Sequence, residues 1–318
     1  MLNILIVGDV MLDRYITGRV TRISPEAPIP VVEYLHTDNR LGGAANVALN
    51  IHAMDATPYL CSVIGTDEEA LIYQEQQQRH QLNLDGILQS EQRKTTVKTR
   101  ILAANQQLLR IDKEDTHDLS ETEQAFLLKK ITEILDNTTI NAIIFQDYNK
   151  GVLTEKTIST LLQLAQQRNI PTAIDPKKKH FFAYQGATLF KPNLKEIREA
   201  LPFAINDTLP SLQRSAEYLV QQLHCQYIMI TLSEKGLYLY ERSVGGELYP
   251  ATHPRIIADV CGAGDTVISV AALSLALGHS AAKMASLANL AGGQVCEKVG
   301  VVPVDKRQLE KEFQISGL

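Results

Sequence analysis

The chain has 318 residues, of which 45% are hydrophobic and 21% are charged, and its formal net charge is −5. This balance is typical of a globular protein, and the length fits one large α/β domain or two smaller ones. A pI near 5.9 argues against a general nucleic-acid-binding protein, which needs a basic surface, and favours a small-molecule partner held by local charges.

The four cysteines are scattered, without a C-x-x-C pair or a histidine at zinc-binding spacing. They are typical of reduced thiols in a reducing compartment. The N-terminal sequence MLNILIVGD carries no basic leader, and no apolar stretch approaches the ~18 residues that span a bilayer. These features predict a cytoplasmic protein without a membrane partner.

Short apolar runs, several of them rich in Ile and Val, alternate with amphipathic segments along most of the chain. The runs are Ile4–Val7, Tyr59–Ile64, Ala142–Phe145, Thr172–Ile174, Ala187–Phe190 and Tyr227–Leu232. Between them, apolar residues recur at i, i+3, i+4 and i+7 over residues 44–51 and 158–165, as in amphipathic helices. The alternation predicts an α/β fold with a doubly wound, mostly parallel sheet flanked by helices. Ligands bind beyond the carboxyl ends of the strands in such sheets, so motifs directly after strands matter most.

Residues 14–36 and 91–112 interrupt this alternation, because their extended segments have no helices between them. The segments are Ile29–Leu35, Thr95–Ile101 and Leu108–Asp112. We expect them to form a small antiparallel β lid that projects from a single domain spanning residues 1–318. Such a sheet can cover a site or form a dimer contact, and a purely structural insertion explains it as well.

Two motifs near the N-terminus offer groups suited to a ligand with several hydroxyls. Asp13 follows the first strand and can accept hydrogen bonds from two hydroxyls, although a lone acid is also a common solvated loop residue. Gly42 and Gly43 let a ligand approach the backbone and place Asn46 in the following helix, where its amide can bond two hydroxyls. The glycines do not match a dinucleotide-binding fingerprint, which reads G-x-G-x-x-G.

Asn193 and Glu196 follow a predicted strand at the spacing of a helix capping box. A cap explains both residues without any ligand. Their place at a carboxyl strand end instead favours a site for nucleotide phosphates and hydrated Mg²⁺, which keeps several waters and takes few protein oxygens. Thr231, Ser233 and Gly236 follow the next strand and either supply donors to the same phosphates or form a hairpin turn.

The sharpest local signal is D-V-C-G-A-G-D-T at residues 259–266, where two glycines open an apolar helix. Unpaired N–H groups at a helix N-terminus point at one place, so Gly262, Ala263 and Gly264 predict an anion hole. A carboxylate there would repel phosphate, and the simplest role for Asp265 is to accept a proton from an attacking hydroxyl. A helix cap with a tight turn accounts for the same residues structurally.

In combination, G-G-A-A-N at residues 42–46, P-N-x-x-E at 192–196 and the 259–266 motif resemble the ribokinase-like carbohydrate kinases, or PfkB family, over residues 3–310. The resemblance implies an ATP-dependent phosphotransferase with Asp265 as catalytic base. It also implies Mg²⁺ near Asn193 and Glu196, held through water, and K⁺ close to Asp259. Lid strands of this family often pair between subunits, which implies a homodimer.

Within the family, residues 8–15, 22–32, 105–112, 147–151 and 174–177 are similar to the heptose 7-phosphate kinases. Those enzymes phosphorylate C1 of D-glycero-D-manno-heptose 7-phosphate on the way to ADP-heptose and the lipopolysaccharide core. The resemblance implies cations for the substrate phosphate, and the candidates are Arg14, Lys98, Arg100 and Lys177. The adenylyltransferase domain often fused to these kinases has no counterpart here, so we expect a separate adenylyltransferase to act downstream.

Two positions depart from the family pattern: Cys261 stands where most members have Thr, and Gln146 replaces a small residue. Kinases of another sugar, sugar phosphate or nucleoside share the general motifs and form the first alternative. A non-catalytic sugar-binding regulator is the second, but such a protein would be free to lose Asp265 and its glycines. The sequence leaves open the anomer, the preferred nucleoside triphosphate and the oligomeric state.

Overall fold

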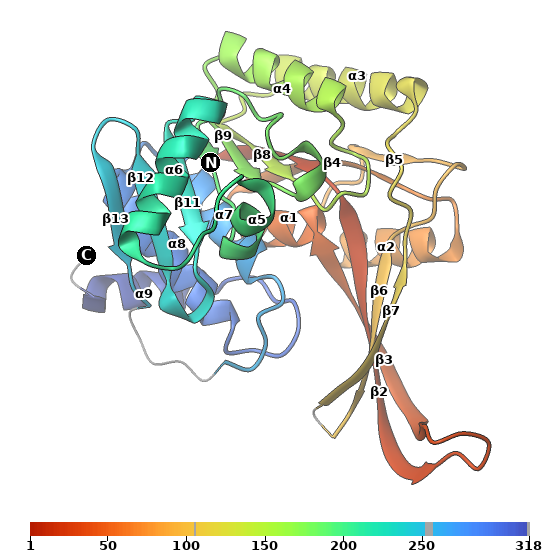
Figure 1. Ribbon diagram of the computed structural model, residues 1–318. Helices are drawn as coiled ribbons and strands as arrows, with labels where there is room; N and C mark the ends of the chain where they lie inside the picture. The colour runs from red at the N-terminus through yellow and green to blue at the C-terminus, as the bar shows by residue number, and fades with distance from the viewer. Residues whose placement is uncertain (105, 252–256, 317–318) are drawn as a thin grey trace.

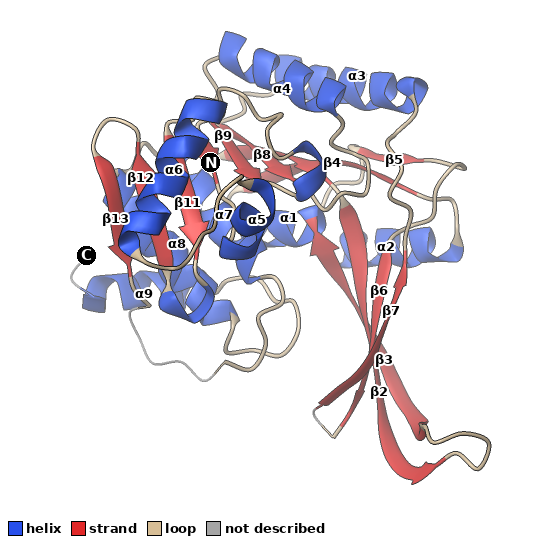
Figure 2. Cartoon of the chain, viewed as in Figure 1, coloured by secondary structure: helices blue, strands red, loops and turns tan. Residues whose placement is uncertain are grey.

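The computed structural model of the protein describes residues 1–104, 106–251 and 257–316, so Asn105 of the 105–112 stretch lies outside the described residues. Its main feature is a β-sheet with helices on both faces (Figures 1 and 2), in the strand order β13-β12-β11-β10-β9-β8-β1-β4-β5. The strands are β1 (Asn3–Gly8), β4 (Thr57–Ile64), β5 (Ile87–Gln89), β8 (Ala142–Gln146), β9 (Thr172–Asp175), β10 (Leu189–Phe190), β11 (Tyr227–Thr231), β12 (Leu237–Glu241) and β13 (Gly245–Tyr249).

The strands from β11 to β5 pair in parallel, while β12 and β13 extend one edge in antiparallel pairing. Parallel pairing aligns the carboxyl ends of β1, β8, β9 and β10 along one edge of the sheet. Gly8 is paired with Gln146 at this edge. A Cβ at Gly8 would lie 2.0 Å from the carbonyl oxygen of Gln146, so glycine is needed for β1 and β8 to approach each other there.

Helices cover both faces of the sheet, which explains why its central strands are apolar at successive positions. On β1, Ile4 and Ile6 belong to one core, and Leu5 and Val7 belong to the other. The first core packs against α1 (Ala44–Ala53), α2 (Glu68–Arg79), α7 (Ala263–Ala276), α8 (Ala281–Val295) and α9 (Lys306–Ser316). The second packs against α3 (Glu121–Asn137), α4 (Glu155–Gln167), α5 (Leu194–Ala200) and α6 (Leu209–Leu223).

A second sheet, in the order β3-β2-β6-β7, projects away from the main body (Figure 1). Its strands are β2 (Val10–Ile23), β3 (Pro30–Gly43), β6 (Val97–Ala103) and β7 (Gln106–Lys113). The hairpins β2–β3 and β6–β7 are antiparallel, and the parallel pairing of β2 with β6 joins them. The small sheet expected from residues 14–36 and 91–112 is therefore present, and one of its pairings is parallel because β2 and β6 both start at the main body.

The doubly wound α/β architecture predicted from the sequence is confirmed by this topology. The assignment of residues 1–318 to a single domain with a lid subdomain stays a prediction. Within the part of the chain that the structure describes, no helix has both the length and the apolar character needed to cross a membrane.

Candidate active site

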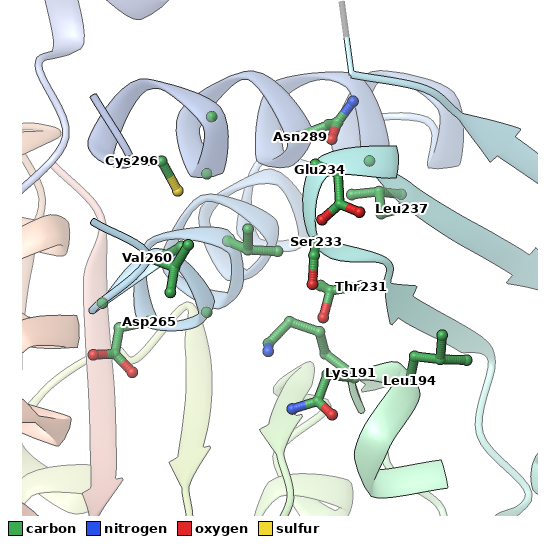
Figure 3. A pocket seen from close by; sticks show the side chains of 18 of the residues that line it. Lys191, Leu194, Thr231, Ser233, Glu234, Leu237, Val260, Asp265, Asn289 and Cys296 are labelled. Atoms are coloured by element: carbon green, nitrogen blue, oxygen red, sulfur yellow. The ribbon is translucent and has the colours of Figure 1, made fainter. Parts of the chain in front are cut away.

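A cavity of about 870 Å³ opens where the carboxyl ends of the strands meet the N-terminus of α7. In Figure 3, Val260, Asp265 and Cys296 line one side, and Lys191, Thr231 and Ser233 face them from the other. Its size is that of a small-molecule site. Of the residues predicted from the sequence, its wall contains Lys177, Asn193, Thr231, Ser233, Gly236, Gly262, Ala263, Gly264 and Asp265.

Asp265 lies in the first turn of α7 and is only 3% exposed. Its Oδ2 accepts a hydrogen bond from Nδ2 of Asn46 at 2.8 Å. Its Oδ1 accepts two, from the hydroxyl of Tyr148 at 2.7 Å and from Nε2 of Gln146 at 2.9 Å. Burial raises the pKa of Asp265 to about 7, while the donors Asn46 and Tyr148 act to lower it. A carboxyl group with a pKa near neutrality is well matched to accepting a proton from an alcohol.

The N-terminus of α7 has the form of an anion hole. Gly262 caps the helix with φ 79° and ψ −2°, a left-handed conformation that favours glycine. The N–H of Ala263 donates to the carbonyl of Val260 at 3.3 Å. Among the described residues, the N–H groups of Gly264 and Asp265 have no backbone acceptor, as expected for the first turn of a helix. These amides and the positive end of the helix dipole favour negative charge in the cavity.

Lys191 places a positive charge beside these amides. A Cβ at Gly264 would lie 3.7 Å from Nζ of Lys191 and 3.7 Å from Oδ2 of Asp175. Lys191 is 2% exposed, and its Nζ lies 3.1 Å from Oδ2 of Asp175. Nε2 of Gln146 also donates to that oxygen at 3.1 Å, so one amide group bridges Asp175 and Asp265. The site thus combines a carboxylate, helix amides and an ammonium group within one buried network.

Asn193 and Glu196 form the capping box that their spacing predicts. Oδ1 of Asn193 accepts from the N–H of Glu196 at 2.9 Å, and Oε2 of Glu196 accepts from the N–H of Asn193 at 2.9 Å. Oε1 of Glu196 accepts from Lys177, whose ammonium also lies 5.3 Å from the centre of the Tyr148 ring. Each carboxylate oxygen keeps a second lone pair, so this donor set fits outer contact with hydrated Mg²⁺. No group of three or more His, Cys, Asp or Glu among the described residues is arranged to hold a metal ion directly.

Thr231, Ser233 and Gly236 form a turn between β11 and β12 that borders the cavity. The N–H of Leu232 donates to the carbonyl of Gly236 at 2.8 Å, and Gly236 has φ 93°. A Cβ at Gly236 would lie 2.1 Å from the carbonyl oxygen of Tyr249. The turn is therefore present and its residues line the cavity, while their contact with nucleotide phosphates stays a prediction.

Asp13, Gly42, Gly43 and Asn46, the groups predicted for the sugar, lie outside the cavity wall. Gly42 faces Asp13, because a Cβ at Gly42 would lie 2.1 Å from Oδ2 of Asp13. Asp13 is 4% exposed and pairs with Arg100. Gly43 is the N-cap residue of α1, which carries the buried Asn46. The sequence predicts hydroxyl binding by Asn46, whereas the structure places its amide on Asp265.

The four cations predicted for a substrate phosphate lie in three places. Lys177 is in the cavity wall, and the other three are on the projecting sheet. Arg14 donates to Asn39 at 2.8 Å and lies 3.8 Å from Glu69. Neighbouring residues on a strand point to opposite faces, so Arg14 faces away from Asp13. Lys98 and Arg100 lie two residues apart on β6 and share the face of Asp13, since Lys98 is the register partner of Asp13.

The Asp259 carboxylate accepts hydrogen bonds both from its own motif, residues 259–266, and from the segment around Gly300. Its Oδ1 accepts from the N–H of Cys261 and its Oδ2 from the N–H of Gly300, both at 3.0 Å. Burial acts to raise the pKa of Asp259, but these N–H donors hold it below its usual value. The side chain is therefore an anion held by backbone donors near the helix.

Sequence reasoning assigned no role in the site to four buried polar residues, Asp9, Gln146, Asp175 and Lys191, or to the half-buried Tyr148. Four of them stand at or just after the carboxyl end of a strand, which is the signal that could have found them. In the sequence, Gln146 and Tyr148 stand out only as part of a family pattern or a departure from it. Their contacts with Asp265 span 119 and 117 residues of sequence.

Comparisons with known proteins agree with this geometry. The model of the pfkB family carbohydrate kinases matches residues 1–307. The chain is 38% identical over 310 residues to the "Bifunctional protein HldE" of Syntrophotalea carbinolica, covering 98% of this chain and 62% of that protein. It is 41% identical over 311 residues to the protein of the same name from Methylobacillus flagellatus, covering 98% and 63%. The chain thus spans less than two thirds of the length of these relatives.

Two solved structures show the same fold at low sequence identity. Phosphofructokinase-2 from Escherichia coli in complex with potassium matches with a TM-score of 0.82 and 16% identity, covering 100% of this chain and 99% of that one. Arabidopsis thaliana ribokinase complexed with ribose and ATP matches with a TM-score of 0.75 and 14% identity, covering 98% of each chain.

Proposed function

Because this chain belongs to the pfkB family of carbohydrate kinases, we propose that it transfers the γ-phosphoryl group of ATP to C1 of D-glycero-D-manno-heptose 7-phosphate. The product is the 1,7-bisphosphate, a precursor of ADP-heptose. The observation that carries the phosphoryl-transfer part is the Asp265 carboxylate, buried in the cavity beside Lys191 and beside the Gly264 and Asp265 amides, which have no backbone acceptor among the described residues. The heptose part is supported by the quoted sequence stretches and by the shared name of the relatives.

In this mechanism the protein mainly positions the reactants and stabilises charge. Asp265 accepts the proton of the sugar hydroxyl while that oxygen attacks the γ-phosphorus in line with the leaving group. The amides of Gly264 and Asp265 and the ammonium of Lys191 face the negative charge that develops on the transferred group. Above the raised pKa of about 7, Asp265 is ionised and ready to accept the proton.

The far end of the cavity is suited to an adenine ring. In Figure 3, the apolar side chain of Leu237 and the amide of Asn289 lie on the side of the cavity away from Asp265. Nδ2 of Asn289 donates to the carbonyls of Tyr249 at 3.3 Å and Pro250 at 2.8 Å, which leaves the Asn289 carbonyl oxygen to accept a hydrogen bond. The exocyclic amine of adenine is such a donor, whereas guanine presents a carbonyl at the same ring position. This arrangement supports ATP as the phosphoryl donor.

Two cations complete the proposed site. Mg²⁺, when bound, neutralises the charge of the nucleotide phosphates, and Glu196 and Asn193 would hold it through its water molecules. Their capping box and the Lys177 contact keep both side chains at the cavity edge before the nucleotide arrives. Asp259 is the proposed anionic neighbour of K⁺, in keeping with its ionised, half-buried carboxylate.

The substrate phosphate is proposed to contact Lys98 and Arg100, which share the face of Asp13. Lys98 is balanced by Asp112 at 3.2 Å and Glu114 at 3.4 Å, so an incoming phosphate competes with these acids. Arg14 is omitted from this set because it faces the opposite way, and Lys177 is assigned to the nucleotide side. Alanine at Lys98 or Arg100 should raise KM for the phosphorylated sugar and leave KM for ATP unchanged.

We further propose a homodimer through the projecting sheet. Several apolar side chains on it are exposed to solvent: Val20, Ile23, Tyr34, Leu35, Leu108, Leu109 and Ile111. Clusters of this kind mark interaction surfaces. Light scattering should give twice the mass of one chain, and Tyr34→Lys should shift it to the mass of one chain.

A single assay tests the proposed activity: ADP release with heptose 7-phosphate, fructose 6-phosphate and ribose, in the wild type and in Asp265→Asn. We expect the highest kcat/KM with the heptose phosphate and a loss of turnover in the variant. A preference for another acceptor would assign the chain to a different sugar, and full activity of the variant would remove Asp265 from its role. An absence of ADP release with every acceptor would favour the non-catalytic alternative.

A further inference from the structure

The two oxygens of the Asp265 carboxylate are held unequally. Oδ1 accepts two hydrogen bonds, from Tyr148 at 2.7 Å and Gln146 at 2.9 Å, whereas Oδ2 accepts one, from Asn46 at 2.8 Å. Each carboxylate oxygen offers two lone pairs in the plane of the group. Oδ1 is therefore fully engaged within the protein, and Oδ2 keeps one lone pair for another proton donor.

Tyr148 is itself held firmly by the loop that carries it. This loop, residues 147–152, follows β8 and is bound to the buried carboxylate of Asp9. Asp9 is 1% exposed and accepts from the N–H groups of Tyr148 at 2.8 Å, Lys150 at 3.0 Å and Val152 at 3.1 Å. A side chain that accepts three backbone N–H groups fixes the path of the loop.

Two further contacts secure the same loop. Oδ2 of Asp147 accepts from the hydroxyl of Tyr184 at 2.9 Å, and Arg93 donates to the carbonyl of Lys150 at 2.9 Å. The loop is thus bound on several sides, and the only hydrogen bond that it makes directly to Asp265, among the described residues, comes from the Tyr148 hydroxyl. This rigidity is what a group that orients another side chain requires.

From this geometry we propose that Tyr148 is a positioning residue for phosphoryl transfer: its hydroxyl holds Oδ1 of Asp265, so that Oδ2 faces the acceptor alcohol and takes its proton. The proposal rests on the kinase activity proposed above. It assigns the proton to one oxygen atom and gives a role to a tyrosine that borders the cavity.

The groups around Asp265 set its pKa, and they show in which direction this pKa moves when the Tyr148 hydroxyl is removed. Burial raises the pKa of Asp265 most strongly; the hydrogen bonds from Asn46 and Tyr148 lower it, the charge of Asp175 raises it and the charge of Lys191 lowers it. A donor to an ionised carboxylate favours the charged form, so loss of the Tyr148 hydroxyl raises this pKa further.

The test is the pH dependence of kcat/KM for the wild type, Tyr148→Phe and Tyr184→Phe, which reports ionisation in the free enzyme. In Tyr148→Phe the acid limb should move up by about one pH unit, the usual effect of one hydrogen bond to a charged group. Tyr184→Phe is the matched control, because it removes the same hydroxyl from Asp147 without touching Asp265. Its acid limb should stay at the wild-type pH, whatever its effect on the rate.

An acid limb of Tyr148→Phe that coincides with the wild type overturns the proposal, as does an equal shift in both variants. Either result leaves the kinase assignment intact, since that depends on ADP release and on Asp265→Asn. If Tyr148→Phe does not fold, 3-fluorotyrosine at position 148 decides the matter. The fluorinated phenol is a stronger donor of the same shape, so the acid limb should move to lower pH, and an unchanged limb would refute the role.

Discussion

Asp265→Asn removes the proposed proton acceptor and a buried negative charge together, with little change in side-chain size. We expect turnover to fall by about 10²–10⁴-fold, the usual effect of losing a general base. The same substitution should also change how stability depends on pH, because burial raises the pKa of Asp265 from 3.8 to about 7. This second effect can be measured without any substrate.

The direction in which stability changes with pH depends on which state binds the Asp265 proton. Between the ordinary and the raised pKa, the unfolded chain has released the Asp265 proton while the native state still holds it. The unfolded state therefore binds fewer protons, and the free energy of unfolding of the wild type falls by ~1.4 kcal/mol per pH unit as pH rises. From about pH 5 up to the raised pKa this amounts to ~3 kcal/mol. Asparagine has no such proton, so the variant avoids this loss.

The substitution also changes the free energy of unfolding in a way that does not depend on pH. The side-chain amide of the Asp265→Asn variant must direct its N–H₂ group either towards Gln146 and Tyr148 or towards Asn46, where a donor already points at the side chain. One unsatisfied donor costs about 1–3 kcal/mol. This cost is the same at both pH values and cancels in the comparison between them.

Urea unfolding of the wild type and the variant, at about pH 5 and about pH 8, measures the difference directly. The stability of the variant relative to the wild type should rise by ~3 kcal/mol between the two conditions. Titrations elsewhere, such as the Asp9–Asp147 pair, occur in both proteins and cancel. A relative stability that is equal at both pH values would show that Asp265 ionises normally and would refute the reasoning about its burial.

Three other substitutions test separate parts of the site. Gly42→Ala places a Cβ 2.1 Å from Oδ2 of Asp13 and should raise KM for the sugar about tenfold without changing KM for ATP, as steady-state kinetics will measure. Asp9→Asn leaves backbone donors of the 147–152 loop unsatisfied and should lower the free energy of unfolding, measured in urea, by about 2 kcal/mol. An unchanged urea midpoint would contradict the role of Asp9 in holding this loop. Lys191→Met removes the ion-pair partner of the buried Asp175 and should destabilise by about 3 kcal/mol. Adding Asp175→Asn should restore the melting temperature but not the activity.

Local features of the site could be predicted from the sequence because neighbouring residues determine them. The capping box of Asn193 and Glu196 depends on residues three positions apart, and it forms as predicted. The glycine cap of α7 depends on Gly262 and the amides that follow it. Apolar runs separated by amphipathic helices were also sufficient for the α/β fold, since such strands must be covered on both faces.

Which distant groups meet depends on the tertiary structure. The contacts of Asp265 with Gln146, Tyr148 and Asn46 join three elements more than 100 residues away in sequence, and no local pattern specifies them. The pairing of β2 with β6 likewise decided that Lys98 and Arg100 share the face of Asp13. Local patterns were enough to predict six strands of the main sheet, two amphipathic helices and the helix-start motif, because these depend on nearby residues. The environment that raises the pKa of Asp265 depends on burial and on long-range packing, which exist only in the folded chain.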